Sequence, residues 1–337
     1  MTTETTTTAT RPPNLPDAGL DGTYWHRYYE QEELAEIVAA TSFVTTVTSG
    51  HIPIHVRVCE QPEPERAPTV VMAHGMLVYG LALARLQLPF HRAGFNVVQF
   101  DVPGMGQSGG PRAGCTTKDI FAAWQSTLDY AAARYDTPLY AMGVAEDGVT
   151  CYYVASARSD VAAISVHTLF EYGDPGGSHW MGSPWMVRAK TIGLALGVRL
   201  MPTVTMPATK AIRYDHVFAG EGDEQFVEQL TADPLGLHGV ELRFAYSLMR
   251  RQRPQVRFED CAIPVQIIGS TGNQIWPIEL LRRSHRRLGG PKELVELPDA
   301  PQWESNRRFQ EQYSEHVIRW FEAHGAKTDR PTRSTER

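Results

Sequence analysis

The stretch PLYAMGVAEDGVTCYYVAS, residues 138–156, decides the fold. It begins with a short apolar run of strand length, residues 139–142, and it continues with helical spacing from Glu146. Between the two stand the small residues Gly143 and Ala145, which suit a sharp bend of the backbone. The sequence therefore predicts a strand that turns at once into a helix, with Ala145 at the tip of the turn.

Outward from this turn, strand-length runs alternate with helical segments along most of the chain. The runs occupy residues 69–73, 96–100, 162–167, 264–268 and 293–297. Helical spacing predicts helices over residues 24–40, 80–92, 120–135, 278–288 and 306–324. Two β-branched runs, at residues 43–48 and 52–59, predict a hairpin before the alternation begins. We expect an α/β fold with a mostly parallel central sheet that starts with an antiparallel hairpin and carries helices on both faces.

Composition divides the chain into a core, an insertion and two tails. Residues 1–22 are rich in Thr and Pro and are expected to form a disordered tail. The core is expected in two parts, residues 23–170 and 256–325. The irregular segment between them, residues 171–255, follows a strand and is expected to form a lid over the edge where the parallel strands end. Residues 326–337 read as a flexible polar tail.

Charge and cysteine spacing exclude several classes of function. The chain has 337 residues and a formal charge of −6, which gives no reason to expect a nucleic-acid partner. Its 4 cysteines form no C-x-x-C pair, so we expect free thiols, no metal site and no cofactor. The longest apolar segment, residues 191–200, is too short for a membrane span and contains Arg199, and the N-terminus lacks a signal-peptide core. We expect a cytoplasmic protein without a membrane partner, and a homodimer stays open.

Three motifs lie where parallel strands end. His74-Gly75-Met76 follows one buried run, residues 101–108 (DVPGMGQS) follow the next, and residues 143–148 (GVAEDG) follow the third. In this order they resemble the H-G-x loop, the D-x-x-G-x-G-x-S loop and the G-x-S-x-G-G turn of the α/β-hydrolase superfamily. The resemblance covers roughly residues 40–325. A dinucleotide-binding domain would need a glycine-rich turn after the first parallel strand, which the sequence does not supply.

The same resemblance implies where a Ser-His-acid triad would stand. Ala145 takes the position of the nucleophile, Asn273 is nearest to the position of the acid, and Gln302 takes the position of the histidine. A methyl group cannot attack a carbonyl carbon, and an amide does not accept a proton near neutral pH. The resemblance therefore implies a member of the superfamily whose triad is replaced.

Backbone N–H groups could still bind a ligand oxygen, because replacing the triad side chains does not remove them. The resemblance implies an oxyanion hole formed by the N–H groups of Met76 and Glu146, within the loop that also holds His74 and Gly75. Glu146 either complements the start of a helix or borders the pocket, and both interpretations stay open. His74 is expected to brace its loop. Tyr79 is expected either to donate a hydrogen bond to a ligand oxygen or to serve only in packing against other side chains.

Other side chains could bind a ligand or supply new chemistry. His167 ends a strand at the same edge and is followed by Glu171 and Asp174, so a relocated histidine and carboxylate pair is one alternative. Large apolar residues crowd the lid, which suits a pocket for a bulky apolar ligand or simple packing. We expect tryptophans to wall this pocket, at Trp180, Trp276 and Trp303.

These observations favour a protein that binds a bulky apolar, carbonyl-containing small molecule. We expect a non-hydrolytic step on that molecule, such as elimination, cyclisation or isomerisation, in a setting of specialised metabolism. Two alternatives remain at this point: a non-catalytic protein that binds a ligand or a partner, and a hydrolase or lyase that uses a relocated histidine and carboxylate.

Overall fold

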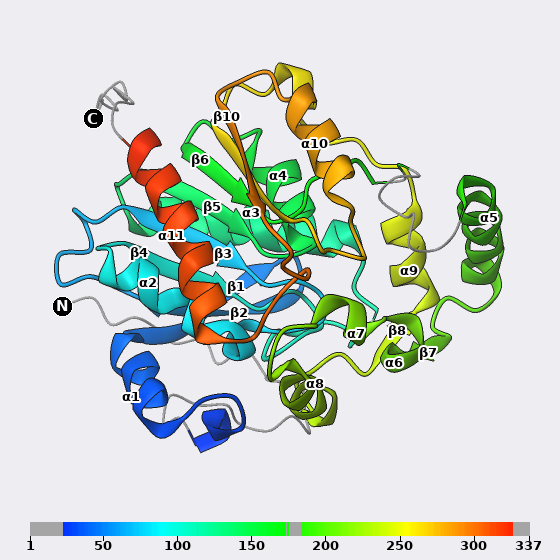
Figure 1. Ribbon diagram of the computed structural model, residues 1–337, viewed down its shortest axis with the longest axis horizontal. Helices are drawn as coiled ribbons and strands as arrows, with labels where there is room; N and C mark the ends of the chain where they lie inside the picture. The colour runs from blue at the N-terminus through cyan, green and yellow to red at the C-terminus, as the bar shows by residue number, and fades with distance from the viewer. Residues whose placement is uncertain (1–22, 113, 173, 175–182, 326–337) are drawn as a thin grey trace.

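The computed structural model describes residues 23–112, 114–172, 174 and 183–325. Within them the chain forms an eight-stranded sheet in the order β1-β2-β4-β3-β5-β6-β9-β10 (Figure 1). The strands are β1 (Phe43–Ser49), β2 (Ile52–Cys59), β3 (Thr69–Ala73), β4 (Asn96–Phe100), β5 (Leu139–Gly143), β6 (Val161–Val166), β9 (Val265–Ser270) and β10 (Lys292–Leu297). β1 and β2 pair antiparallel, β2 pairs antiparallel with β4, and all other neighbours in the sheet are parallel. The predicted sheet with its antiparallel start is confirmed.

Helices cover the sheet in two layers. α2 (Gln87–Arg92) and α11 (Arg307–His324) pack together on one side, in front of the sheet in Figure 1. α3 (Thr117–Arg134) and α4 (Asp147–Ala155) pack together on the other side. α10 (Ile278–Arg287) lies beside β9 and β10, and α1 (Gln31–Ala40) packs near α2. Because all five residues of β3, β4 and β5 are buried, these three strands form the centre of the core.

Local sequence signals determine where the two longest helices, α3 and α11, begin. Thr116 and Asp119 form a capping box at the start of α3, in which each side chain satisfies a backbone N–H group of the other residue. The side chain of Asn306 accepts a hydrogen bond from the backbone N–H of Phe309 and caps α11. These signals explain why both helices begin close to their predicted positions.

Two predicted helices are interrupted in the structure. The segment predicted over residues 80–92 is a 3₁₀ helix, Gly80–Leu86, followed by α2. Pro89 has no N–H group and is tolerated only in a first helical turn, so the α-helix starts just before it. The segment predicted over residues 24–40 is a 3₁₀ helix, Thr23–Arg27, followed by α1.

The segment between β6 and β9 is largely helical. It contains α5 (Pro184–Leu200), α6 (Ala208–Ala211), α7 (Tyr214–Val217), α8 (Asp223–Ala232), α9 (Leu242–Met249) and a 3₁₀ helix, Phe258–Asp260. β7 (Thr205–Pro207) and β8 (Gly239–Glu241) form a small antiparallel sheet in the same segment. In Figure 1 α5, α6, α9, β7 and β8 lie to the right of the main sheet, with α5 outermost, and α8 lies at the bottom of the view. The predicted tails, residues 1–22 and 326–337, lie outside the described residues.

Two features are absent from the part of the chain that the structure describes. None of its helices has both the length and the apolar character that crossing a bilayer requires. No group of three or more His, Cys, Asp or Glu side chains there is arranged to hold a metal ion.

Candidate functional site

The turn between β5 and α4 places Ala145 in a strained backbone conformation. Its φ is +51°, in the left-handed region that side chains with a β-carbon rarely adopt. Gly143 and Gly148 make the turn possible, because a β-carbon on Gly143 would lie 2.6 Å from the α-carbon of Gly148. Strain of this kind persists where the surrounding structure enforces it, and it is commonly found at functional sites. The sharp strand-to-helix turn expected from the sequence is therefore present, with a methyl group at its tip.

The loop that follows β3 lies directly against this turn. His74 is buried and joins the loop to the loop after β4: its Nε2 accepts a hydrogen bond from the backbone N–H of Val102, at 2.9 Å, and its Nδ1 lies 2.8 Å from the carbonyl oxygen of Gly75. With both ring nitrogens engaged, Nδ1 is the protonated one, and burial lowers the pKa of this histidine. His74 thus holds the loop in place as a neutral ring.

A large cavity opens in front of Ala145. Its volume is about 650 Å³, within the range of small-molecule binding sites. Among its described lining residues there is no serine, threonine, cysteine or tyrosine, and Glu146 is the only carboxylic acid. The walls are mainly aliphatic and aromatic, and the larger apolar side chains among them are Met76, Leu77, Leu83, Phe170, Leu194, Met206, Ile212, Phe218, Leu237, Phe244, Leu248, Met249, Ile275, Trp276 and Trp303.

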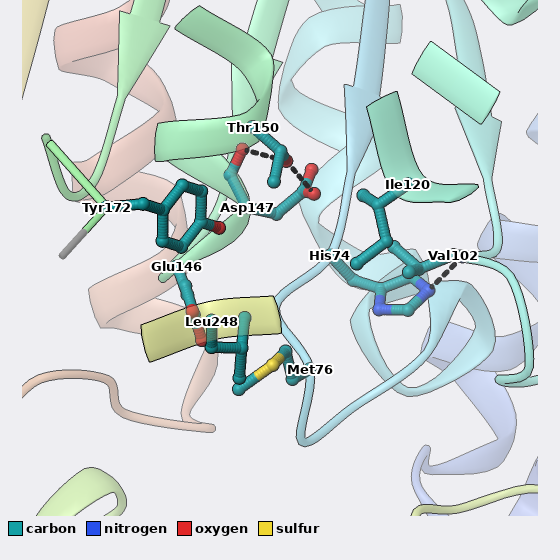
Figure 2. Close-up of a pocket in the computed structure, with 9 residues that line it drawn as sticks. All are labelled: His74, Met76, Val102, Ile120, Glu146, Asp147, Thr150, Tyr172 and Leu248. Carbon is teal, nitrogen blue, oxygen red and sulfur yellow. Dashed lines mark hydrogen bonds between the residues drawn. The ribbon is translucent and has the colours of Figure 1, made fainter. Parts of the chain in front are cut away.

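Glu146 lies between this cavity and a small cavity behind the turn. In Figure 2 its side chain points toward Met76 and Leu248, below the ring of Tyr172. The residue is 7% exposed, and burial, followed by the negative charge of Asp147, raises the pKa of its carboxyl group to about 8. Glu146 is therefore mostly protonated at neutral pH and can donate a hydrogen bond.

Asp147 is directed away from Glu146 and is engaged by the protein itself. It accepts hydrogen bonds from the indole N–H of Trp124, at 2.9 Å, and from the hydroxyl of Thr150. Burial raises its pKa to about 7, although both hydrogen bonds act in the opposite direction. Each carboxyl oxygen of Asp147 has a donor within the protein, and Asp147 does not line the large cavity, whereas Glu146 does. Of the two interpretations of Glu146, the one in which it borders the pocket therefore fits the structure.

Two backbone N–H groups beside Ala145 have no hydrogen-bond acceptor among the described residues. No described residue accepts a hydrogen bond from the backbone N–H of Met76 or from that of Glu146. Both residues line the large cavity. A ligand oxygen placed between the two groups would meet two donors, as in the oxyanion hole that the sequence resemblance implies.

Gln302 and two tryptophans lie on the cavity wall near the ends of β9 and β10. Gln302 is 2% exposed, and its Oε1 has no hydrogen-bond partner among the described residues. The indole N–H groups of Trp276 and Trp303 are equally without a described partner. An unpaired buried polar group carries a cost in stability, which a bound ligand or water molecule would remove.

Asn273 does not line the large cavity. Its Oδ1 accepts hydrogen bonds from the backbone N–H groups of Ile275, at 2.8 Å, and Trp276, at 3.0 Å. The side chain therefore closes a turn in the loop after β9. This turn holds Trp276 against the cavity.

The structure does not bring His167 together with the carboxylates that follow it. The imidazole is buried against Trp303 and Tyr313, and neither ring nitrogen has a hydrogen-bond partner among the described residues. Burial lowers its pKa to about 4. Glu171 and Asp174 instead form ion pairs, with Arg287 and Arg283 respectively. The paired arrangement considered from the sequence is absent in the described part of the chain.

Tyr79 also lies away from the cavity. Its hydroxyl donates a hydrogen bond to Asp233, a buried residue that also accepts hydrogen bonds from Tyr24 and Tyr28. This cluster joins the first helical segment, the core and the segment after β6. We therefore leave Tyr79 out of the candidate site. Trp180, expected on the pocket wall, lies outside the described residues.

Sequence reasoning missed the part of the cavity contributed by the insertion. Phe218 and Phe244 line it, as do the cationic residues Lys190, Lys210 and Arg213. Apart from Lys190, which lies on α5, these residues belong to or adjoin short helices, and no sequence pattern pointed to them.

Comparisons with known proteins agree with this architecture. A family model described as serine aminopeptidase, S33, matches residues 64–300. A search of curated protein sequences gave no match.

Solved structures of α/β-hydrolases match nearly their whole length. The monoacylglycerol lipase of Paleococcus ferrophilus is 19% identical, with a TM-score of 0.64 over 80% of this chain and 99% of its own. A soluble variant of the Saccharomyces cerevisiae monoglyceride lipase, in complex with a substrate analog, is 15% identical, with a TM-score of 0.67 over 85% and 96%. DcsB, in complex with its substrate analogue, is 14% identical, with a TM-score of 0.66 over 85% and 99%. At these identities the likeness establishes the fold and leaves the reaction open.

Proposed function

The chain belongs to the serine aminopeptidase S33 family of α/β-hydrolases, and from that premise we propose that it is a non-hydrolytic enzyme acting on a bulky apolar carbonyl compound. The proposed reaction moves a proton within the ligand, in an elimination, a cyclisation or an isomerisation. The observation that carries the proposal is the methyl group of Ala145 at the strained turn, beside an acid, Glu146, that faces a large apolar cavity.

The absence of a nucleophile at the turn supports a reaction without a covalent intermediate. Acyl transfer on this fold needs a hydroxyl or thiol at the turn and a base next to it. Ala145 offers neither, and the described lining residues include no other hydroxyl or thiol. Gln302, at the position where the family resemblance places the base, carries an amide. Asn273, nearest to the position of the acid, is occupied by the backbone of its own loop.

The environment of Glu146 suits proton transfer. An acid or base works best when its pKa lies near the working pH, and burial raises the pKa of Glu146 to about 8. Near neutrality its acid form can donate to a ligand carbonyl, and the smaller carboxylate fraction can take a proton from the neighbouring carbon. The proton removed is returned to the ligand at another position, or a leaving group departs with the electron pair, so no co-reactant is needed.

The cavity supports the proposed ligand class. About 650 Å³ enclosed by aliphatic and aromatic side chains suits an apolar molecule of drug-like size. The backbone N–H groups of Met76 and Glu146, together with the amide of Gln302, would orient a carbonyl oxygen. Preorganised donors of this kind stabilise the negative charge that develops on such an oxygen when a neighbouring proton leaves.

Two assays test the proposal. Short-chain nitrophenyl esters are given to the wild type and to Ala145→Ser, and we expect no turnover above background from either, because the variant still lacks a base. A bulky ketone such as progesterone is then incubated in D₂O with the wild type, Glu146→Gln and Gln302→Leu, and deuterium uptake next to the carbonyl is followed by mass spectrometry. We expect the wild type to accelerate exchange, and Glu146→Gln to lose roughly 10²-fold or more of that rate while still binding the ketone.

The outcomes separate the alternatives. Robust ester hydrolysis by the wild type contradicts the proposal. Ketone binding without any exchange favours a non-catalytic binding protein.

One observation supports a second candidate. His216 lines the cavity, and its Nε2 lies 3.9 Å from an oxygen of Asp215. This is a histidine and carboxylate pair, although Arg213 also binds Asp215. If His216→Gln abolishes deuterium exchange and Glu146→Gln does not, the reaction depends on this pair.

A further inference from the structure

α5 presents large apolar side chains to solvent along one face. Trp185 is 72% exposed and Leu200 is 80% exposed, and Ile192 and Leu196 lie between them with more than half of their surface accessible. Positions 185, 192, 196 and 200 fall on one side of a helix with 3.6 residues per turn. Met201, Val204 and Met206, which follow α5 in the chain, are also exposed, and Met206 lines the large cavity as well. Single exposed apolar residues are ordinary, but a continuous row of this size marks an interaction surface.

The other side of α5 faces the protein. Val187 is buried, and Leu194 and Lys190 line the large cavity. The main neighbour of α5 is α9, and Figure 1 shows α5 at the outer edge of the molecule beyond it. α5 is therefore apolar toward both sides and separates the cavity from the surroundings.

The charge of this region differs from that of the whole chain. Residues 183–206, which include α5 and the exposed apolar residues after it, contain no aspartate or glutamate. The same residues include three cationic side chains, Arg188, Lys190 and Arg199, of which Lys190 lines the large cavity. The full chain carries a formal charge of −6, so cationic charge is concentrated where the apolar surface is exposed. Arg188 and Arg199 flank the exposed row at positions next to it on the helix.

We propose that this face, formed by α5 and the residues after it up to Met206, binds the surface of an anionic lipid membrane. An apolar helical face flanked by arginine and lysine inserts into the boundary between headgroups and acyl chains, and its cations bind anionic headgroups. The absence of a spanning segment in the sequence led to the expectation of no membrane partner, but contact with a membrane surface needs no spanning segment. Because α5 also lines the cavity, an apolar ligand would pass between bilayer and cavity along this helix.

Charge distinguishes this occupant from a second copy of the chain. A twofold contact through α5 would bring Arg188 and Arg199 of one copy close to the same residues of the other, without an acidic residue on the face to offset them. Such a contact is electrostatically unfavourable, whereas an anionic bilayer is complementary to the same charges. The proposal does not depend on the reaction at Glu146.

Vesicle co-sedimentation of the full-length protein without substrate tests the proposal. Vesicles of phosphatidylcholine alone are compared with vesicles that contain equal parts of phosphatidylcholine and phosphatidylglycerol, at low and high salt. We expect binding to the anionic vesicles that weakens with salt, and roughly fivefold weaker binding for Arg188→Gln. Arg66→Gln is the charge control, since Arg66 is a highly exposed arginine elsewhere on the surface.

Substitutions of the apolar row test the insertion itself. Leu196→Gln with Leu200→Gln keeps good helix formers and should weaken binding by tenfold or more, whereas Val44→Thr, on the exposed face of β1, should leave it unchanged. Trp185 is the one exposed tryptophan among the described residues, so a blue shift of fluorescence on vesicle binding should disappear in Trp185→Phe while sedimentation persists.

Several results would overturn the proposal. One is the absence of binding to anionic vesicles, and another is unchanged binding after the double substitution. A third is a dimer in solution that the double substitution dissociates without any vesicle binding, which would assign the face to a second copy. Binding only to an acidic carrier protein would assign it to a protein partner. None of these results concerns deuterium exchange. The membrane contact of α5 and the reaction at Glu146 can therefore be contradicted independently of each other.

Discussion

A β-carbon built on Gly75 would lie 2.6 Å from the β-carbon of Ala145. Carbon atoms that are not bonded do not approach so closely, so the loop after β3 and the turn after β5 are in contact without spare room. The contact fixes the backbone of Gly75 and Met76 beside the tip of the turn. Residue 75 must therefore be a glycine for as long as residue 145 carries a side chain in this conformation.

We predict that Gly75→Ala destabilises the protein and impairs ligand binding. The added methyl group must displace the loop, because the nearest atoms belong to Ala145 and to the carbonyl of Val144, which are held by the turn. Overpacking of this kind costs about 1–3 kcal/mol. Chemical denaturation gives the stability, and fluorescence of a bound apolar dye reports on the cavity. Gly193→Ala is the matched control: nothing lies within 4 Å of its added β-carbon, and an alanine within α5 should stabilise slightly.

The stability of the protein should depend on pH through Glu146. Its pKa is about 8 in the folded state and 4.5 for an ordinary glutamate, so between these values the folded chain keeps a proton that the unfolded chain has lost. The stabilising contribution is complete below pH 4.5 and is lost as the pH rises through 8. We expect the free energy of unfolding to fall over this window, by at most about 1.4 kcal/mol for each pH unit from this group.

The Glu146→Gln variant isolates this effect. It should be more stable than the wild type above pH 8, because no charge is forced into the buried site. Asp147, with a pKa raised to about 7, keeps a slope of the same sign in the variant, and that slope should end near pH 7. Urea denaturation of both proteins between pH 5 and pH 9 measures the difference. Parallel curves over the whole range would show that Glu146 is accessible to water and has an ordinary pKa.

The frame of the fold could be predicted because its signals are local. The run at 139–142 followed by small residues gave the turn at Ala145, and β-branched residues gave the hairpin β1 and β2. The segment at 80–92 differs from a single helix because Pro89 has no N–H group, so the α-helix begins at Gln87 after a 3₁₀ helix. The segment at 24–40 was divided because contacts distant in sequence hold its tyrosines, such as the hydrogen bond from Tyr29 to the carbonyl of Leu81.

The candidate site was predictable only where it depends on the ends of strands. Ala145, Glu146 and Gln302 were expected together and do line one cavity. The orientation of Tyr79 toward Asp233 could not be foreseen, because Asp233 lies 154 residues further along the chain. The cationic side chains on the cavity wall were missed for the same reason, since they come from elements whose packing no local pattern specifies.

Asn273 should behave as a structural residue that tolerates aspartate. Its Oδ1 accepts two backbone hydrogen bonds, and an aspartate oxygen at the same position would accept both. We expect Asn273→Asp to leave the melting temperature within about 2 °C, and Asn273→Ala to cost roughly 1–2 kcal/mol because two backbone N–H groups lose their acceptor. Differential scanning calorimetry of both variants checks this. Equal destabilisation by the two substitutions would mean that the amide N–H₂ group, and not the oxygen, is the essential part.

Asp233 should be among the residues that contribute most to stability outside the central sheet. Tyr24, Tyr28 and Tyr79 all donate their hydroxyl groups to it, and its Oδ1 also accepts from the backbone N–H of Leu235. Asp233→Ala leaves buried hydroxyl groups without an acceptor, and each costs about 1–3 kcal/mol. We expect a loss of roughly 3 kcal/mol or more in urea denaturation.

The tyrosines provide the internal test of this account. Removing both partners of a buried hydrogen bond costs less than removing one, so Tyr28→Phe and Tyr79→Phe should each recover part of the stability lost in Asp233→Ala. Tyr24 is partly exposed and its hydroxyl can turn to water, so Tyr24→Phe should recover little. The double-mutant cycles give these interaction energies directly. Strictly additive effects for Tyr79 and Asp233 would show that the two do not interact, and that this hydrogen bond does not join the loop after β3 to the segment after β6.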